Sequence, residues 1–238
     1  MAELKRDKDW QVIPKIEEKY YRKMDKDMDK KMAVRYFMQF GTVRRALEGQ
    51  EVCGDAYFIK AFENKVLIAV IDGLGHGYDA AVAANTAVEY IKNNYKKGLT
   101  EIIKGCHKEM KETRGAAIGI VLIDLESSTL RYTGVGNIEV RVKSRTVIRP
   151  ISINGILGYN LRQVREEEFP YRQGDIIILH SDGISTKFDL NLYPPEFLGQ
   201  HPQAIAERIA AEFGRESDDL TIVVAREDKR ETRESDKE

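Results

Sequence analysis

The stretch VLIAVIDG, residues 66–73, decides the fold of this chain, because six apolar residues run directly into an Asp-Gly pair. An apolar run of this length that is bounded by turn residues predicts a buried strand. The stretch IIILHSDG, residues 176–183, repeats the arrangement. Each stretch places an aspartate, Asp72 or Asp182, at the end of a buried strand. An isolated Asp-Gly is more often a turn than a metal ligand, since Gly supplies a permissive backbone and Asp caps its own turn.

Two more aspartates flank predicted strands. Asp55 stands directly before an expected strand over residues 56–62, and Asp218 precedes a closing strand over residues 221–225. Carboxylates gathered at the ends of buried strands repel one another and are costly to dehydrate, so their convergence makes sense chiefly if cations neutralise them. Ligation by oxygen alone suits Mg²⁺ or Mn²⁺ better than Zn²⁺, which usually recruits His or Cys.

The other elements follow from periodicity. Apolar residues recur at three- and four-residue steps over residues 78–95, which predicts an amphipathic helix; a second helix is expected over residues 100–111, with Thr100 as a possible N-cap, and a last one from near Pro202 to near Gly214. Strands are expected over residues 33–40, 56–62, 65–71, 116–123, 129–133, 138–142, 147–151, 166–171, 176–180 and 221–225. Strands interrupted by helices, without regular β-α alternation, predict an α+β layered domain with mainly antiparallel sheets.

Length and charge favour one domain. The chain has 238 residues, and no linker divides it, so we expect a single domain over residues 33–226 between a charged N-terminal extension, residues 1–32, and a charged, disordered tail, residues 227–238. The extension is either a solvated arm or a docking segment for a partner. Lys and Arg total 38 against 39 for Asp and Glu, so no overall field would gather nucleic acid or a membrane surface.

The cysteines and the chain start suggest a cytoplasmic protein. Cys53 and Cys106 are too few for a disulfide framework, and neither begins a C-x5-R phosphatase loop. Cys53 is interpreted as a packed thiol rather than an oxidation sensor, and His180 as a structural histidine. The first thirty residues lack the apolar core of a signal peptide, and no apolar run approaches the roughly 18 residues of a membrane helix.

Five short motifs occur in a fixed order: Gly54-Asp55, Asp72-Gly73-Leu74-Gly75-His76-Gly77, Gly136-Asn137, Ser181-Asp182-Gly183 and Asp218-Asp219-Leu220-Thr221. Their order and spacing resemble those of the PPM (PP2C-like) metal-dependent protein serine/threonine phosphatases. The resemblance spans residues 33–226. It is closest to the SpoIIE-like branch, and within that to RsbX-type phosphatases of the stressosome, because Arg114-Gly115-Ala116 and Val135-Gly136-Asn137 are also similar to theirs.

The resemblance implies a four-layer α-β-β-α sandwich with two divalent cations, Mn²⁺ or Mg²⁺, at one edge. Asp72 would bridge both ions, Asp55 and the Gly73 carbonyl would bind one, and Asp182 and Asp218 would bind the other. Asp219 takes the less direct position beside Asp218. A water bridging the metals would then attack the phosphoserine phosphorus in line.

Two departures from the better-known eukaryotic members concern the phosphate group. Leu74 stands where they have a histidine proposed as the general acid, so His76, two residues later, either serves as the acid or only shapes the loop. Gln50 replaces their phosphate-binding arginine. Arg44 and Arg45 are the candidates for this contact, or else surface charges.

The leading function hypothesis is hydrolysis of phosphoserine or phosphothreonine on a signalling protein, and the resemblance suggests STAS-domain proteins of a stressosome in a bacterial stress response. A catalytically idle module that only binds phosphoproteins is the first alternative, and four intact aspartates argue against it. The second is a small-molecule phosphohydrolase, because the chemistry does not itself require a protein substrate.

Overall fold

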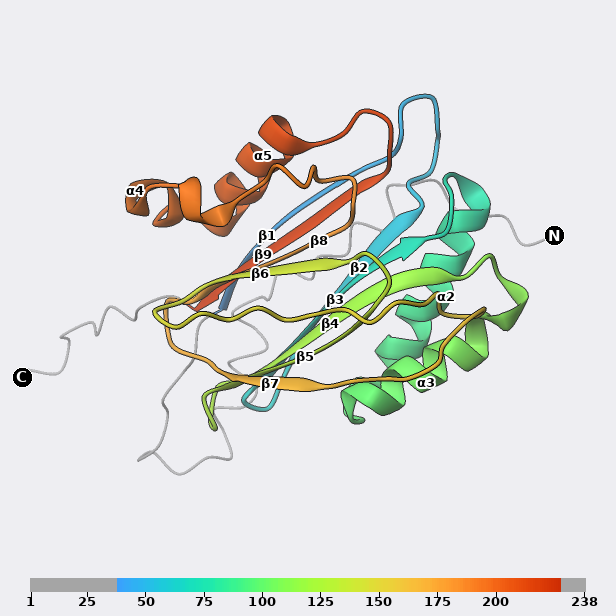
Figure 1. Cartoon of the computed structure of the whole chain (residues 1–238), viewed down its shortest axis with the longest axis horizontal. Coiled ribbons are helices and arrows are strands. Elements are labelled where there is room, and N and C mark those ends of the chain that lie inside the picture. The colour runs from blue at the N-terminus through green and yellow to red at the C-terminus, as the bar shows by residue number, and fades with distance from the viewer. Residues whose placement is uncertain (1–37, 228–238) are drawn as a thin grey trace, which may run out of the picture. The chain divides into compact units, whose positions relative to one another are not determined.

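The computed structural model describes residues 38–227 and arranges them as two β-sheets with helices outside them (Figure 1). The predicted extension, residues 1–32, the first part of the strand predicted over residues 33–40, and the tail from residue 228 onward lie outside the described residues.

Both sheets are antiparallel throughout. Sheet A contains, in spatial order, β1 (Met38–Arg45), β9 (Leu220–Glu227), β8 (Ile176–His180) and β6 (Glu139–Lys143). Sheet B contains β2 (Asp55–Phe62), β3 (Lys65–Gly73), β4 (Ala116–Asp124), β5 (Thr129–Val135) and β7 (Glu167–Pro170). The predicted α+β class with antiparallel sheets is therefore confirmed.

The apolar run in β3 faces two different cores. Its even-numbered residues, from Val66 to Val70, pack between the sheets, whereas its odd-numbered residues, from Leu67 to Ile71, pack beneath α2 and α3. In β8, Ile177 and Leu179 likewise join the core between the sheets, while their neighbours join a third core beneath α5. Successive strand residues point to opposite faces, so a continuous apolar run is what a sheet covered on both faces requires.

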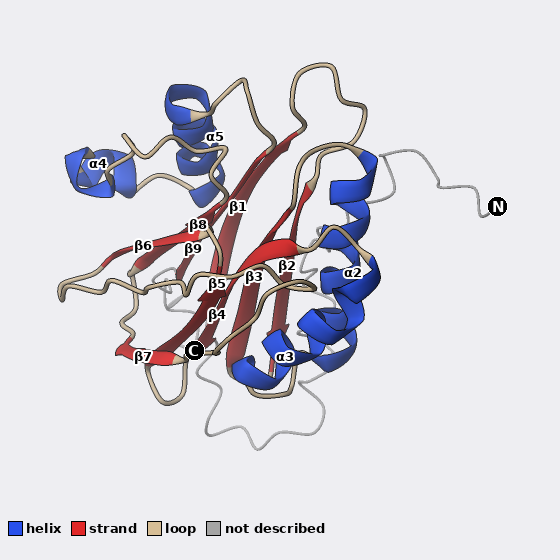
Figure 2. Ribbon diagram, turned by 45° about the vertical axis from the view of Figure 1, so that its right-hand side comes forward, coloured by secondary structure: helices blue, strands red, loops and turns tan. Residues whose placement is uncertain are grey.

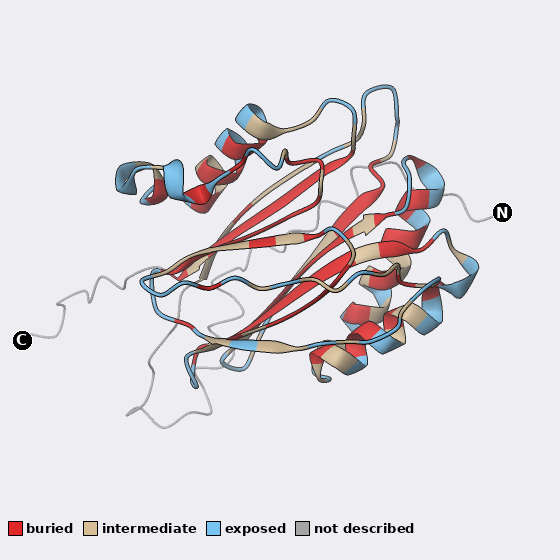
Figure 3. Cartoon of the chain, in the orientation of Figure 1, coloured by how far each residue is buried: buried red, intermediate tan, exposed pale blue. Residues whose placement is uncertain are grey.

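Helices cover the outer face of each sheet (Figure 2). Sheet B carries α2 (Tyr78–Asn94) and α3 (Leu99–Glu109), followed by the short η2 (Met110–Glu112); sheet A carries α4 (Pro195–Leu198) and α5 (Pro202–Phe213), preceded by η3 (Leu190–Leu192). Buried residues face the sheets and exposed ones face outward (Figure 3). The expected four-layer α-β-β-α sandwich is confirmed. No helix described between residues 38 and 227 is both long and apolar enough to cross a bilayer.

The start of α3 differs from the prediction. Gly98, not Thr100, is the N-cap, and the Glu101 side chain accepts a hydrogen bond of 3.2 Å from the Gly98 backbone N–H. This contact satisfies one backbone donor at the helix start, as in a capping box. Thr100 already lies inside the helix.

Two predicted strands also need correction. Residues 147–151 form no strand, and Val147 and Ile151 are 80% and 63% exposed, so this apolar stretch supplies no continuous core face. Strand β1 extends beyond the predicted end at Phe40 to Arg45, because it stays paired with β9 as far as Leu220.

The packing of α5 on sheet A makes Gly41 a sensitive position. A Cβ at residue 41 would lie 2.2 Å from the Gln203 backbone nitrogen, so the first turn of α5 leaves no room for it. We expect Gly41→Ala to lower the free energy of unfolding by about 2–3 kcal/mol through overpacking, measured by urea denaturation. Gly98→Ala is the matched control, since its added Cβ would meet only the Glu101 carboxylate at 3.5 Å. Equal losses in the two variants would contradict this close packing.

Candidate active site

The four predicted aspartates lie at strand ends on one edge of the two sheets. Asp55 begins β2 and pairs with Asp72 near the end of β3. Asp182 follows β8, and Asp218 precedes β9; the pairing of these two strands continues past His180 through a hydrogen bond of 3.0 Å from the Ser181 backbone N–H to the Thr221 carbonyl. Each sheet thus contributes two carboxylates.

Electrostatics show that these carboxylates come together. Burial raises the pKa of Asp72 well above its ordinary value, and the negative charges of Asp55, Asp182 and Asp218 raise it further. Burial raises the pKa of Asp218 as well, with Asp182 as the next cause. The four predicted aspartates therefore lie at one edge of the sheets, near enough for their charges to act on one another.

Asp55 is the most deeply buried of the four, at 1% exposure. Its Oδ2 accepts a hydrogen bond of 2.6 Å from the Ser181 hydroxyl, and that hydroxyl accepts one of 3.0 Å from the Thr221 backbone N–H. Burial raises the pKa of Asp55 to about 7, against the opposing effect of the Ser181 hydrogen bond, and the charges of Asp219 and Asp182 also raise it. The Ser181 hydroxyl thus links β9 of sheet A to the Asp55 carboxylate of sheet B. The sequence did not predict this role.

Asp218 and Asp219 have different contacts. Both carboxylate oxygens of Asp219 accept backbone hydrogen bonds of 2.9 Å, one from Leu47 and one from Gly54. Asp219 therefore holds the loop before β2 in place. Its own backbone N–H donates to Asp218 Oδ1 at 2.9 Å, and Asp218 is the less buried of the two.

Gly73 lies where no side chain fits. A Cβ at this residue would lie 2.0 Å from the Ala80 carbonyl oxygen in the first turn of α2, and the Gly73 N–H donates to the Gly54 carbonyl at 3.2 Å. The backbone after Asp72 is consequently clamped between α2 and the loop that carries Asp55.

His76 lies in the exposed loop that follows. The loop is anchored by a hydrogen bond of 2.9 Å from the Leu74 N–H to the Gly115 carbonyl. Beside it, Arg114 forms an ion pair of 2.7 Å with Asp79 at the start of α2. His76 is therefore close in sequence to Asp72 and open to solvent, which is what a group that meets a substrate needs.

The two candidate arginines have different surroundings. Arg44 donates from Nε to the Asp55 carbonyl at 2.8 Å and from a terminal nitrogen to the Cys53 carbonyl at 3.0 Å. Arg45 is exposed and donates to the Arg215 carbonyl at 2.8 Å. Arg44 therefore holds the backbone at the start of β2, whereas Arg45 is a surface charge with one backbone contact.

The buried Cys53 behaves as a packed thiol. Burial, followed by the charge of Asp55, raises its pKa to about 12, so the thiol stays protonated at neutral pH. Its Sγ lies 3.4 Å from the Arg45 carbonyl oxygen, to which it donates. A protonated thiol is a poor metal ligand and a poor nucleophile.

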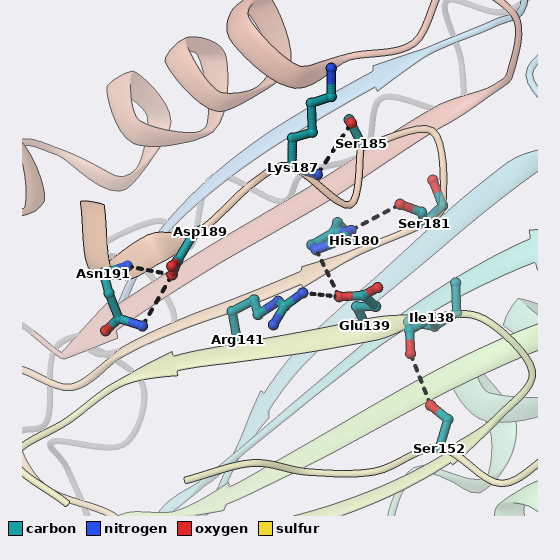
Figure 4. A network of polar contacts seen from close by, with 10 residues as sticks. All are labelled: Ile138, Glu139, Arg141, Ser152, His180, Ser181, Ser185, Lys187, Asp189 and Asn191. Atoms are coloured by element: carbon teal, nitrogen blue, oxygen red, sulfur yellow. Dashed lines mark hydrogen bonds and ion pairs between the residues drawn. The ribbon is translucent and has the colours of Figure 1, made fainter. Parts of the chain in front are cut away.

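His180 lies just behind the site in a polar network on sheet A (Figure 4). Its Nδ1 is 2.9 Å from the Ser181 carbonyl oxygen, and its Nε2 is 4.0 Å from a Glu139 carboxylate oxygen that also pairs with Arg141. Burial lowers the pKa of His180, which favours the neutral ring. The interpretation of His180 as a structural histidine is supported by the contact of Nδ1 with Ser181. The buried Nε2 has no hydrogen-bond partner among the described residues.

The sequence did not predict the contact of Asn137 either. It follows Gly136 in one of the five motifs, and its side-chain Nδ2 donates to Asp182 Oδ2 at 2.8 Å. A polar residue two positions after the end of β5 was the available signal, but it did not identify the partner.

The donors at this edge suit a hard cation. They are carboxylates and backbone carbonyls, without an available thiolate. Within residues 38–227, no three His, Cys, Asp or Glu side chains are arranged to share one ion. Mg²⁺ takes oxygen ligands and keeps several waters, so the carboxylates and carbonyls of this edge are ligands of the right kind for it.

Comparison with known proteins gives consistent results. The family described as Stage II sporulation protein E (SpoIIE) matches residues 63–228. Among curated proteins, the Phosphoserine phosphatase RsbX of Bacillus subtilis (strain 168) is 28% identical over 179 residues, which cover 74% of this chain and 88% of that protein.

Solved structures agree with the fold. One reported as "The bacterial stressosome: a modular system that has been adapted to control secondary messenger signaling" has a TM-score of 0.75 and 34% identity, covering 80% of this chain and 100% of that one. RsbX in complex with magnesium has a TM-score of 0.69 and 26% identity, covering 82% of this chain and 99% of that one. The predicted resemblance is thereby confirmed.

The raised pKa values predict how the stability of the metal-free protein changes with pH. An aspartate carboxyl has an ordinary pKa of 3.8, whereas burial raises the pKa to about 7 for Asp55 and to about 8 for Asp72 in the folded protein. Between these limits the folded state binds more protons, so its stability falls as pH rises from about 4 to about 8. Asp72→Asn should flatten this dependence and raise the free energy of unfolding at pH 8 by about 1–2 kcal/mol, because it removes a buried charge.

Urea denaturation in EDTA at pH 5 and pH 8 measures the effect. Asp124→Asn is the control. Asp124 lies at the end of β4 that is remote from Asp72, where it pairs with Lys65 of β3 and forms an ion pair of 3.4 Å with it. If Asp72→Asn is no more stable than the wild type at pH 8, the four carboxylates do not repel one another as described.

Proposed function

We propose, from the premise that this chain belongs to the SpoIIE family of PP2C-like protein serine/threonine phosphatases, that it removes phosphate from phosphoserine or phosphothreonine on a signalling protein. The observation that carries the proposal is that Asp55, Asp72, Asp182 and Asp218 all lie at strand ends on one edge of the sandwich. Such a concentration of negative charge has a chemical use when divalent cations neutralise it.

The proposed roles divide the carboxylates between two cations, Mn²⁺ or Mg²⁺. Asp72 would hold both ions, Asp55 and the Gly73 carbonyl would hold one of them, and Asp182 and Asp218 would hold the other. The position of Asp72 beside Asp55, with the charges of Asp182 and Asp218 acting on it, supports the bridging role. When bound, the cations supply a water acidic enough to attack phosphorus and offset charge on the phosphoryl group.

The protein's own groups shape this reaction. Ser181 orients Asp55 and favours its charged form, and Asp219 fixes the loop that carries it. As water oxygen bonds to phosphorus, the bond to the serine oxygen breaks, and that oxygen needs a proton. We assign the proton donation to His76, because it is exposed and four residues from Asp72. The Gly residues on either side of it, at φ +90° and +72°, give the loop a backbone conformation that other residues rarely adopt.

The proposal extends to the identity of the substrate proteins. We infer phosphorylated STAS-domain proteins of a stressosome, in a bacterial stress-response pathway, as the substrates. Support comes from the similarity to a phosphoserine phosphatase of Bacillus subtilis and to a structure described as a stressosome system. The absence of a dominant net charge, 38 basic against 39 acidic residues, leaves the choice of partner to local contacts rather than to long-range attraction.

Replacing Asp72 tests the reaction itself. With Mn²⁺, the wild type should hydrolyse both p-nitrophenyl phosphate and a phosphoserine protein. Asp72→Asn should lower kcat on both by about 100- to 1000-fold, because the substitution removes charge stabilisation worth several kcal/mol. Asp124→Asn should retain wild-type rates. Full activity of Asp72→Asn would contradict the bridging assignment, and an inactive wild type that still binds phosphoproteins would favour an idle binding module.

The role of His76 can be isolated through the leaving group. Nitrophenolate leaves without protonation, whereas a serine alkoxide requires a proton. We therefore expect His76→Gln to lower kcat by about 100-fold on a phosphoserine protein but by less than about threefold on p-nitrophenyl phosphate. His201→Gln is the control, as His201 lies at the start of α5 beneath sheet A. Equal effects on the two substrates would show that His76 only shapes the loop.

A further inference from the structure

Asn137 lies where the chain crosses between the sheets. It belongs to the short connection between the end of β5 at Val135, in sheet B, and the start of β6 at Glu139, in sheet A. The aspartates of the site also come from both sheets: Asp72 lies at the end of a strand in sheet B, and Asp182 follows a strand in sheet A. The crossover therefore passes between the two halves of the site.

The backbone on either side of Asn137 is fixed. Gly136 has φ +91°, and a Cβ there would lie 2.5 Å from that of Ala117, so the chain passes against β4. Ile138, on the other side, is buried, and its carbonyl accepts a hydrogen bond of 2.9 Å from Ser152 (Figure 4). The orientation of the exposed Asn137 side chain is set by two anchored neighbours rather than by its own packing.

The Asn137 amide contacts one carboxylate of the site directly. It donates to Asp182 Oδ2 at 2.8 Å. This contact joins the crossover that leaves sheet B to the aspartate that follows β8 in sheet A.

An amide is well suited to this position. It offers N–H donors and carries no charge, so it orients carboxylates without neutralising them. A carboxylate at residue 137 would add negative charge to the cluster, and a lysine would compete with cations for the aspartates. Residues that hydrogen-bond to metal ligands typically change metal affinity by 10- to 100-fold when they are removed.

We infer that Asn137 is a positioning residue that orients the Asp182 carboxylate for a divalent cation, and so sets the affinity of the site for metal. This inference rests on the proposed function, since it concerns one of the same carboxylates. It predicts that Asn137 acts on metal binding rather than on the contact with substrate.

Calorimetric titration with Mn²⁺ tests the inference. Asn137→Ala should weaken Mn²⁺ binding by about 10- to 100-fold, and the rise in melting temperature caused by a fixed Mn²⁺ concentration should shrink accordingly. At saturating Mn²⁺, KM for p-nitrophenyl phosphate should stay within about twofold of the wild-type value. Because Asn137 is exposed, the substitution should not unfold the protein, which melting in EDTA checks.

Asn93→Ala provides the matched control. Asn93 also makes one side-chain hydrogen bond, of 2.9 Å to the Glu89 carbonyl, but on the exposed face of α2. It should leave Mn²⁺ affinity unchanged. Unchanged affinity in Asn137→Ala, or a raised KM at normal affinity, would overturn the positioning role. A wild type that neither binds Mn²⁺ nor hydrolyses phosphate esters would instead overturn the proposed function.

Discussion

Repulsion among four carboxylates at one edge of the sandwich is the constraint on which the rest of the structure depends. Burial alone makes Asp55 and Asp72 hard to ionise, and their neighbours make it harder. The protein meets this cost with donors that carry no charge: the Ser181 hydroxyl, the Asn137 amide and backbone N–H groups. Positive side chains nearby, such as Arg44, bind backbone carbonyls instead. The negative charge is thus left for a cation to neutralise.

Close backbone packing makes this concentration of charge possible. Gly73 lies against α2, and Gly183 lies against the chain just before β9, where an added Cβ would be 2.0 Å from the Asp219 carbonyl oxygen. Each glycine directly follows one of the aspartates. The apolar cores on both faces of β3 and β8 hold these strand ends rigidly. Precision at the site therefore derives from packing in the layers behind it.

The sequence predicted the parts of this structure that have a strong period or a strong motif. The apolar runs ending at Asp72 and Asp182, and the alanine-rich helix over residues 78–95, were placed within a few residues. The stretch over residues 147–151 misled because β-branched residues favour strands only where a partner strand and a core are available. Long-range contacts such as Ser181 with Asp55, 126 residues apart, leave no local pattern. The role of Arg44 was missed for the same reason.

The strand order has a consequence for how the protein is made. Strand β1 pairs with β9, and Asp218 lies just before β9, so the first and last described strands are neighbours at the site. A chain still on the ribosome lacks both the partner of β1 and Asp218 until its last described strand emerges. Sheet A and the edge where the four aspartates lie are therefore completed late in synthesis.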